Sequence, residues 1–176
     1  MDPIPKPFSF QVEAAEGWMM LGDPQSAAEE LARLPAEYQD HPNTLAVKWS
    51  LHALLEQWEE AWQISRKLCD ALPHCAGIWV CHAESTRKHK GIQEALNVLS
   101  GVAGKFPRDA SVSYQLACLC TLTGHIEEAR YYLKKAFVNG DAKKMRLTAL
   151  RDPDLQPLWE RADSYPLLAL KDEETE

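Results

Sequence analysis

The sequence predicts an all-α fold, an α-solenoid of four helix-turn-helix repeats followed by C-terminal capping helices. The first observation is a recurring pattern of an apolar residue, Glu and Ala, which places Ala61, Ala95 and Ala129 at equal intervals. Ala27 continues the same spacing toward the N-terminus. A repeat of about 34 residues is typical of stacked helical hairpins. We expect alanine at these positions because the two helices of each hairpin cross closely there.

The second observation is that glycines and prolines fall at positions that fit this spacing. Gly22, Gly91 and Gly124 lie in the predicted turns inside the hairpins. Pro73 and Pro107, which are one repeat length apart, follow the predicted second helices of the middle repeats. Proline cannot continue a helix interior, so these positions mark where the second helices end.

The third observation is an amphipathic pattern in the predicted second helices, clearest in the last repeat. Apolar residues that recur at steps of three and four lie on one face of a helix. In the last repeat these residues are Ile126, Ala129, Leu133, Ala136 and Phe137. The spacing therefore predicts one buried stripe on each second helix.

The elements follow in order along the chain. Residues 1–7 contain three prolines, so we expect an extended lead-in there. Residues 144–165 carry an amphipathic pattern around Arg151-Asp152-Pro153, and we expect them to form helices that cap the last repeat. Residues 166–176 are acidic, and we expect them to be disordered. The four predicted repeats are 8–41, 42–75, 76–109 and 110–143.

The composition favours a cytoplasmic protein that binds neither nucleic acid nor a membrane. The net charge is −7, whereas binding to phosphates needs a concentrated basic face. No apolar run approaches the roughly 18 residues of a membrane-spanning helix, and the first residues lack the pattern of a signal peptide. The five cysteines form no CxxC pair, which suits a reducing compartment.

The chemistry of the side chains indicates no enzyme, no cofactor and no metal site. Residues 101–105 are rich in glycine, but they lack the spacer and the following Ser or Thr of a nucleotide-binding loop. His74-Cys75 and Cys81-His82 do not form the repeated ligand pairs of a structural zinc site. Three glutamates recur at the start of second helices, where negative charge is favoured by the helix dipole: Glu60, Glu94 and Glu128.

Residues 8–143 resemble the tetratricopeptide repeat (TPR) family. The family combines a bulky residue early in the first helix with small residues at the helix crossings, then an apolar residue and a proline. Trp49 departs from this pattern, because the family has a small residue at that position. The matching residues are Trp79, Ala83, Ala95, Leu99 and Pro107 in the third repeat, and Leu116, Ala117, Gly124, Ala129, Leu133 and Ala136 in the fourth.

The resemblance implies a right-handed superhelical α-solenoid, with a cap similar to that of bacterial members, that acts as a non-catalytic protein-interaction scaffold. In this family the first helices line a concave groove, which we expect to bind a peptide or helix of a partner protein. The predicted groove residues are Glu13, Glu16, Met20, Val47, Ser50, Leu54, Val80, Cys81, Glu84, Arg87, Lys88, Tyr114, Gln115, Cys118 and Leu122.

Two other functions remain open at this point. One is a secretion or assembly chaperone of the class II kind found in type III systems, and the other is a regulatory subunit that docks a separate enzyme. The cluster of Lys, Asn and Arg with which one TPR subgroup holds chaperone C-termini is absent. Trp62, on the second helix of the second repeat, predicts a weak self-association in addition to the protein partner.

Overall fold

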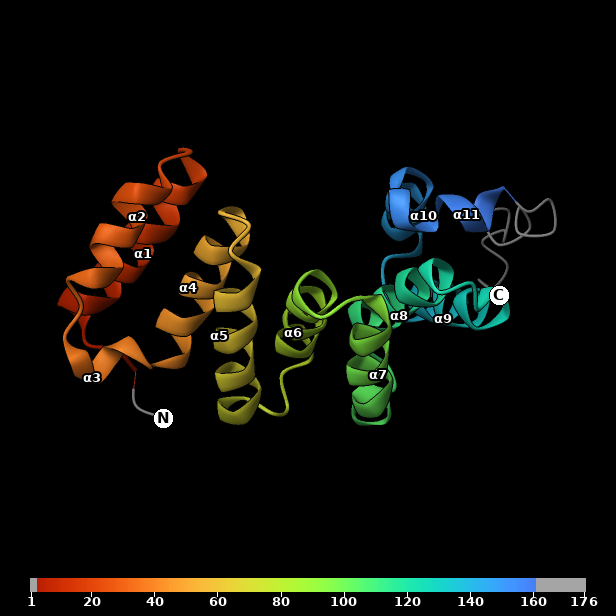
Figure 1. Ribbon diagram of the computed structural model, residues 1–176, viewed down its shortest axis with the longest axis horizontal. Coiled ribbons are helices and arrows are strands. Elements are labelled where there is room, and N and C mark those ends of the chain that lie inside the picture. Colours follow the sequence, from red (N-terminus) through yellow and green to blue (C-terminus); the bar gives the residue numbers. More distant parts are fainter. Residues whose placement is uncertain (1–2, 161–176) are drawn as a thin grey trace, which may run out of the picture. The chain divides into compact units, whose positions relative to one another are not determined.

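The computed structural model describes residues 3–160 and places them in helices and connecting turns (Figure 1). The predicted all-α fold of helical repeats is confirmed. The chain divides into two compact units, whose described residues are 3–89 and 90–160. The division falls after His89, inside the predicted third repeat, and the repeat boundaries stay a prediction. The predicted acidic tail 166–176 and the last residues of the predicted cap, 161–165, lie outside the described residues.

The N-terminal unit consists of helical hairpins that pack side by side. α1 contacts α2, and both contact α4, while α5 lies between α4 and α6. The first helices of its two complete hairpins, α1 and α4, are therefore neighbours. The helices are α1 (Lys6–Met20), α2 (Pro24–Ala32), α3 (Ala36–Gln39), α4 (Pro42–Leu54), α5 (Trp58–Ala71) and α6 (Ala76–His89).

Helix α1 begins earlier than predicted, at Lys6, inside the segment expected to be extended. Pro5 precedes its first residue and Pro7 lies in its first turn. A helix leaves the first four N–H groups without partners inside the helix, so a proline in the first turn sacrifices no hydrogen bond. The prolines of residues 1–7 thus mark a helix start, and the prediction of an extended lead-in up to residue 7 was wrong.

Turns inside the hairpins contain a residue with positive φ, which is either a glycine or a glutamate. Gly22 and Gly124 have φ of 80°, in the left-handed region that glycine adopts without strain. Glu56, at the position equivalent to Gly22 in the next hairpin, adopts φ of 56° with a side chain. After Gly22, Asp23 caps α2 by accepting a hydrogen bond from the backbone N–H of Ser26 at 3.0 Å, and the same bond holds the pKa of Asp23 below its usual value.

Helix α3 was not predicted, because it is a single turn without an amphipathic pattern. Gln39, its last residue, donates to the carbonyl oxygens of Leu31 at 3.0 Å and Leu34 at 2.7 Å. The Leu31 carbonyl lies in the last turn of α2, where a helix leaves acceptors without partners inside the helix, and the Leu34 carbonyl lies just after the helix. Lys48 of α4 donates to the backbone oxygen of Gln39 at 2.9 Å. One glutamine therefore ties the connection between the first two hairpins to both of them.

The core of the N-terminal unit joins the first two hairpins. Ala27 and Ala61, two of the four alanines that define the repeat, are fully buried. Complete burial is what a close helix crossing would require at these positions. The residues of the core cluster around the first hairpin are Ile4, Val12, Ala15, Ala27, Leu31, Leu34, Val47 and Leu51.

The C-terminal unit packs its helices around α8. α7 contacts α8, α8 and α9 form a hairpin, and α10 contacts α9. The alanines of the repeat in this unit, Ala95 and Ala129, are again fully buried. The elements are α7 (Ile92–Val102), η1 (Ala103–Lys105), α8 (Ala110–Leu122), α9 (Ile126–Asn139), α10 (Ala142–Arg151), η2 (Pro153–Leu155) and α11 (Gln156–Trp159).

The segment after α9 covers apolar surface of the C-terminal unit. Leu155 and Leu158 are fully buried, and η2 and α11 pack against α8. The Trp159 indole N–H donates to the carbonyl oxygen of Ala149 at 2.9 Å, which ties α11 to α10. Asp152 precedes η2 and caps it by accepting a hydrogen bond from the backbone N–H of Asp154 at 3.0 Å.

Candidate functional site

A cavity lies between α1 and α4 in the N-terminal unit, and it brings together three of the predicted groove residues. Its volume is about 250 Å³. Glu13, Glu16 and Val47 come from the predicted groove, and the remaining lining residues were not predicted. The complete lining is Ile4, Ser9, Val12, Glu13, Glu16, Asn43, Ala46 and Val47.

The two helices supply different chemistry to this cavity. Val12 and Val47 are 7% and 4% exposed and belong to the core cluster of the unit, so they form an apolar floor. Glu13 and Glu16 lie one turn apart on the same face of α1, and both are exposed. Within residues 3–160, neither carboxylate forms an ion pair. The cavity therefore has an apolar floor and an unpaired negative rim.

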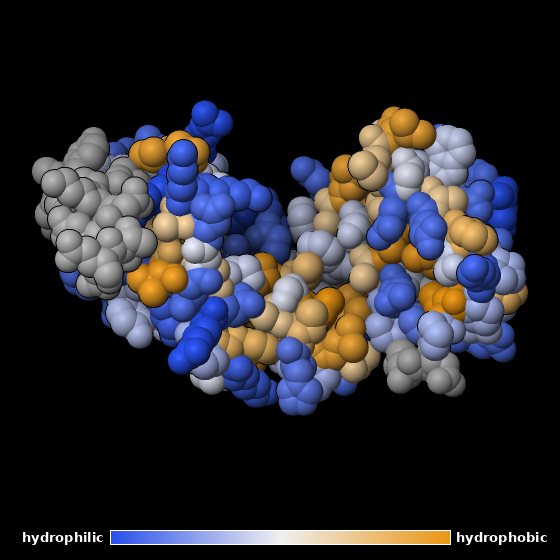
Figure 2. All heavy atoms as spheres, turned by 180° about the vertical axis from the view of Figure 1, so that it is seen from behind, coloured by the Kyte–Doolittle hydropathy of each residue, from blue (hydrophilic) through white to orange (hydrophobic). Residues whose placement is uncertain are grey.

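Two predicted groove residues at the ends of these helices expose apolar surface. Met20 ends α1 and is 89% exposed, and Leu54 ends α4 and is 54% exposed. The neighbouring Leu21 and Leu55 are exposed as well. Apolar side chains stand out at the upper end of the N-terminal unit, at the right of Figure 2, on the side where α1 and α4 end in Figure 1. Ser50 is exposed on α4, between Val47 of the cavity and Leu54 at the end of the helix.

The predicted groove residues of α6 are engaged inside the N-terminal unit. Arg87 donates to both carboxylate oxygens of Glu84, each at 3.1 Å. The Lys88 ammonium lies 5.6 Å from the centre of the Trp58 ring. Both cations that were expected to face a partner are therefore paired within the chain. Val80 and Cys81 are half-buried, and burial raises the pKa of the Cys81 thiol to about 11, which keeps it protonated.

A buried polar network crosses α4, α5 and α6 and was not found from the sequence. The Trp49 indole N–H donates to the Ser85 hydroxyl at 3.0 Å. That hydroxyl lies 3.2 Å from the hydroxyl of Ser65, which is 2.8 Å from Nδ1 of His82. Trp49 is the bulky residue at a position where the family has a small one, and its polar edge meets a hydroxyl of the following hairpin. Serines on separate helices give no sequence signal that they will meet.

His82 is held by the hydroxyl of Ser65. That hydroxyl lies 2.9 Å from the carbonyl oxygen of Trp62 and 2.8 Å from Nδ1 of the ring. A hydroxyl has one proton, so it donates to one of these two groups, and the tautomer of the ring follows from which one it is. The ring is 8% exposed, and desolvation, together with the charge of Arg66, lowers the pKa of His82, while Asp70 opposes this shift. His82 of α6 therefore packs against Ser65 and Trp62 of α5, inside the interface between these two helices.

Trp62 is held inside the N-terminal unit, and its predicted self-association finds no support. Its ring centre lies 5.4 Å from that of His89 and 6.4 Å from that of His82. The Arg66 guanidinium lies 4.9 Å from the same ring. The indole is half-buried by these neighbours. The contacts of Trp62 are therefore made within its own unit.

In the C-terminal unit, two predicted groove residues contact the chain's own capping segment. The Tyr114 hydroxyl donates to Asp152 at 2.8 Å, and the Cys118 thiol lies 3.7 Å from the same carboxylate oxygen. Burial, followed by the hydrogen bond to Asp152, raises the pKa of Tyr114. Cys118 is 2% exposed, so its prediction as a groove-lining residue was wrong. Gln115 and Leu122 are half-buried on the same helix.

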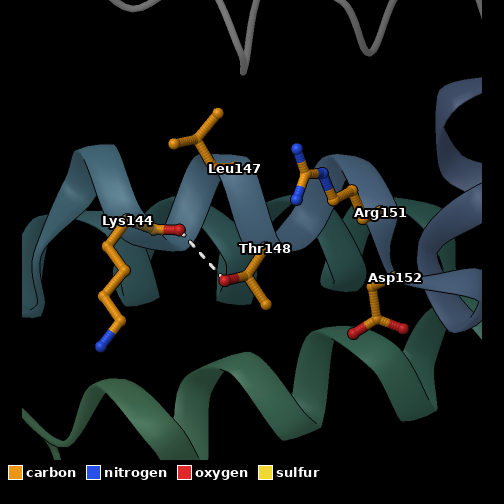
Figure 3. Close-up of a pocket in the computed structure, with 5 residues that line it drawn as sticks. All are labelled: Lys144, Leu147, Thr148, Arg151 and Asp152. Atoms are coloured by element: carbon orange, nitrogen blue, oxygen red, sulfur yellow. Dashed lines mark hydrogen bonds between the residues drawn. The ribbon is translucent and has the colours of Figure 1, made fainter.

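A second cavity, of about 380 Å³, lies along α10 (Figure 3). It contains no predicted groove residue. Leu147 points away from Lys144 and Thr148. The Lys144 ammonium and the Asp152 carboxylate lie at opposite ends of the view, so the polar groups of the cavity do not converge on one point. The Thr148 hydroxyl donates to the carbonyl oxygen of Lys144 at 3.1 Å, a bond within the helix. Pockets that bind small molecules place a few polar groups together, and this arrangement does not.

Two further features bear on the kind of site that the chain can form. Among residues 3–160, no three His, Cys, Asp or Glu side chains are grouped closely enough to hold a metal ion. The same part of the chain contains no helix with the length and apolar character needed to cross a membrane. The strongest candidate site is therefore the cavity between α1 and α4.

Comparison with known proteins shows the fold. No protein-family model matches the sequence, and no curated protein matches it. The chain is similar to TTC0263, a thermophilic TPR protein in Thermus thermophilus, with a TM-score of 0.70 and 19% identity over 92% of this chain and 86% of that one. It is also similar to YrrB, a TPR protein with an unusual peptide-binding site, with a TM-score of 0.60 and 12% identity over 90% and 88%.

A third similar structure is MamA from Desulfovibrio magneticus RS-1, with a TM-score of 0.65 and 18% identity over 97% of this chain and 99% of that one. Identities this low support the fold and not a shared activity. The chain has the tetratricopeptide repeat fold, as its sequence pattern predicted.

Proposed function

We propose that this chain, which has the TPR fold, is a non-catalytic protein-binding module that holds a peptide or helix of a partner on α1 and α4. The observation that carries the proposal is the cavity between these helices, with its apolar floor and exposed carboxylates. An apolar depression with a few polar groups at its rim is the usual form of a recognition site. YrrB, similar in fold, is a TPR protein with a peptide-binding site, which supports the same kind of ligand here.

The exposed apolar ends of the same two helices support a binding surface there. Met20 and Leu54 are 89% and 54% exposed. Exposed apolar groups that gather on one surface are common at protein interfaces. A partner with apolar anchors would remove these side chains from water, and α1 and α4 would supply both the anchors and the cavity.

The C-terminal unit offers less for a partner on α8. Tyr114 is bonded to Asp152, and Cys118 is buried beside the same carboxylate. A partner that used these residues would first have to displace the chain's own capping segment. We therefore place the main contact on the N-terminal unit.

Site-specific crosslinking tests this proposal. The photoreactive amino acid p-benzoylphenylalanine would replace Ser50, which is exposed on α4, in the full-length chain. A matched control would carry the same group in place of Glu59, which is exposed on α5. After irradiation in native lysate, we expect a discrete crosslinked protein from the Ser50 position and none from the Glu59 position.

The pattern of crosslinks decides between the alternatives. The same products from both positions, or products from the Glu59 position alone, would contradict a site on α1 and α4. Mass spectrometry of the product then identifies the kind of partner. A secreted protein would favour the chaperone alternative, and an enzyme would favour the regulatory-subunit alternative.

A further inference from the structure

The cavity between α1 and α4 has the size of a site for one side chain. Its volume is about 250 Å³, below the range of roughly 300–1,000 Å³ that is common for small-molecule pockets. Its floor is formed by Ile4, Val12 and Val47, each less than 9% exposed. A long aliphatic stem would cover this floor and exclude water from it.

The negative charge at the rim favours a positively charged group in the cavity. Glu13 and Glu16 line the cavity, and no Lys, Arg or His is among the described residues that line it. Within residues 3–160 both carboxylates lack an ion-pair partner. The surroundings reinforce this charge, because residues 1–89 contain seven Lys and Arg against thirteen Asp and Glu. An anionic group would be repelled, whereas a cation would gain two acceptors.

From these observations we propose that the cavity seats the side chain of an arginine or lysine of the bound partner. Such side chains lay an aliphatic stem on apolar surface and keep the charged head in water. The stem would lie on Val12 and Val47, and the head would reach Glu13 and Glu16 at the rim. Arginine fits better than lysine, because a planar guanidinium is more weakly hydrated and can bond two carboxylate oxygens at once.

The inference rests on the proposed function, because it names the chemistry of the partner at that same site. It predicts that partner segments carry at least one basic residue next to the apolar residues that would cover Met20 and Leu54. Electrostatic complementarity of this kind selects partners and speeds their association more than it raises affinity. A net acidic peptide would be excluded by the same carboxylates.

Titration with n-butylguanidinium, followed by ¹H–¹⁵N NMR of the full-length chain, tests the inference directly. We expect saturable shifts of amides in residues 9–16 and 43–47, which border the cavity. n-Butylurea, a neutral compound of nearly the same shape, should leave these amides unchanged. Salt should weaken the guanidinium response, since exposed charges are screened.

A charge-neutral variant completes the test. In Glu13→Gln/Glu16→Gln the guanidinium should bind roughly fivefold more weakly, since exposed ion pairs are individually weak. The matched control is Glu59→Gln/Glu60→Gln, which removes the same charge from α5 and should bind as the unmodified chain does. Equal shifts with butylurea, an unaltered response of the first variant, or no saturable shift at all would overturn the inference. Crosslinking at Ser50 in that case would leave peptide binding standing without a basic anchor.

Discussion

Acidification should destabilise the N-terminal unit through His82. The ring is 8% exposed, its centre lies 6.4 Å from that of Trp62 and 6.3 Å from that of Trp79, and its Nδ1 forms a hydrogen bond with the Ser65 hydroxyl. Protonation of the ring would place a charge in a desolvated site beside Arg66. Asp70 would compensate only in part, since its effect on the pKa is smaller than that of burial and Arg66.

The direction and size of this effect follow from the lowered pKa of His82. The unfolded chain takes up the proton near pH 6.5, the ordinary value for histidine, while the folded chain takes it up only at lower pH. Between these two values the unfolded state binds more protons, so the free energy of unfolding falls as the pH falls. The loss for one group is at most about 1.4 kcal/mol for each pH unit. Below the folded-state pKa the loss stops growing.

The measurement is a series of urea unfolding curves between pH 7.5 and pH 5, followed by circular dichroism. The control is His82→Gln, because the glutamine amide offers Ser65 a donor or an acceptor and does not titrate in this range. Hydrogen bonds to Ser26 and Lys67 lower the pKa values of Asp23 and Asp40. The stability that these two carboxylates contribute is lost mainly as the pH falls below about 3.8. The effect of these two carboxylates therefore lies below the pH range of the unfolding series.

The difference between the two pH profiles carries the result. We expect the unmodified chain to lose stability more steeply than His82→Gln below pH 6.5. Profiles that run parallel over the whole range would refute the reasoning, because His82 would then bind protons equally well in the folded and unfolded states. A steeper loss in the variant would refute it as well.

Other substitutions test individual contacts, each by chemical unfolding. Tyr114→Phe should cost roughly 1.5–3 kcal/mol, since it removes the bond to the charged Asp152, and an unchanged stability would contradict an anchoring contact. Ala129→Leu should cost roughly 1–3 kcal/mol, because the fully buried alanine leaves no room. Glu56→Gly should gain about 0.5 kcal/mol, because relief of the positive φ exceeds the added entropy of the unfolded chain. Gly140→Ala should destabilise, since a new Cβ would lie 3.0 Å from the Cβ of Ala110 and 3.3 Å from the backbone oxygen of Ala136, besides displacing the Met145 sulfur.

Features with a local cause could be predicted from the sequence. The buried alanines Ala27, Ala61, Ala95 and Ala129 were found from their spacing, because every hairpin repeats the same close crossing. Pro73 follows the end of α5, and Pro107 follows η1, the short helix after α7, because proline is excluded from a helix interior. The prolines near the N-terminus were misread, since the same residue is accepted in a first turn. Both outcomes depend on only a few neighbouring residues.

Features that depend on side chains from separate helices could not be predicted. The cations Arg87 and Lys88 were expected to face a partner, but Glu84 and Trp58 hold them within the N-terminal unit. Cys118 was expected in a groove and is buried beside the capping segment. A repeat pattern indicates which face of a helix a residue occupies, but it does not show which other side chain reaches that residue.

The sequence alone determined the class of the protein, which is a series of helical hairpins repeated at a constant interval. Most turns inside the hairpins contain glycine, and alanine recurs where the two helices of a hairpin meet. These properties arise from backbone preferences and from a stripe that must be buried, and both are written in local spacing. Only the tertiary structure showed the cavity on which the proposed partner site rests. The cavity between α1 and α4 depends on how two helices from different hairpins pack, and the absence of a cation beside Glu13 and Glu16 among the described residues depends on every neighbouring side chain.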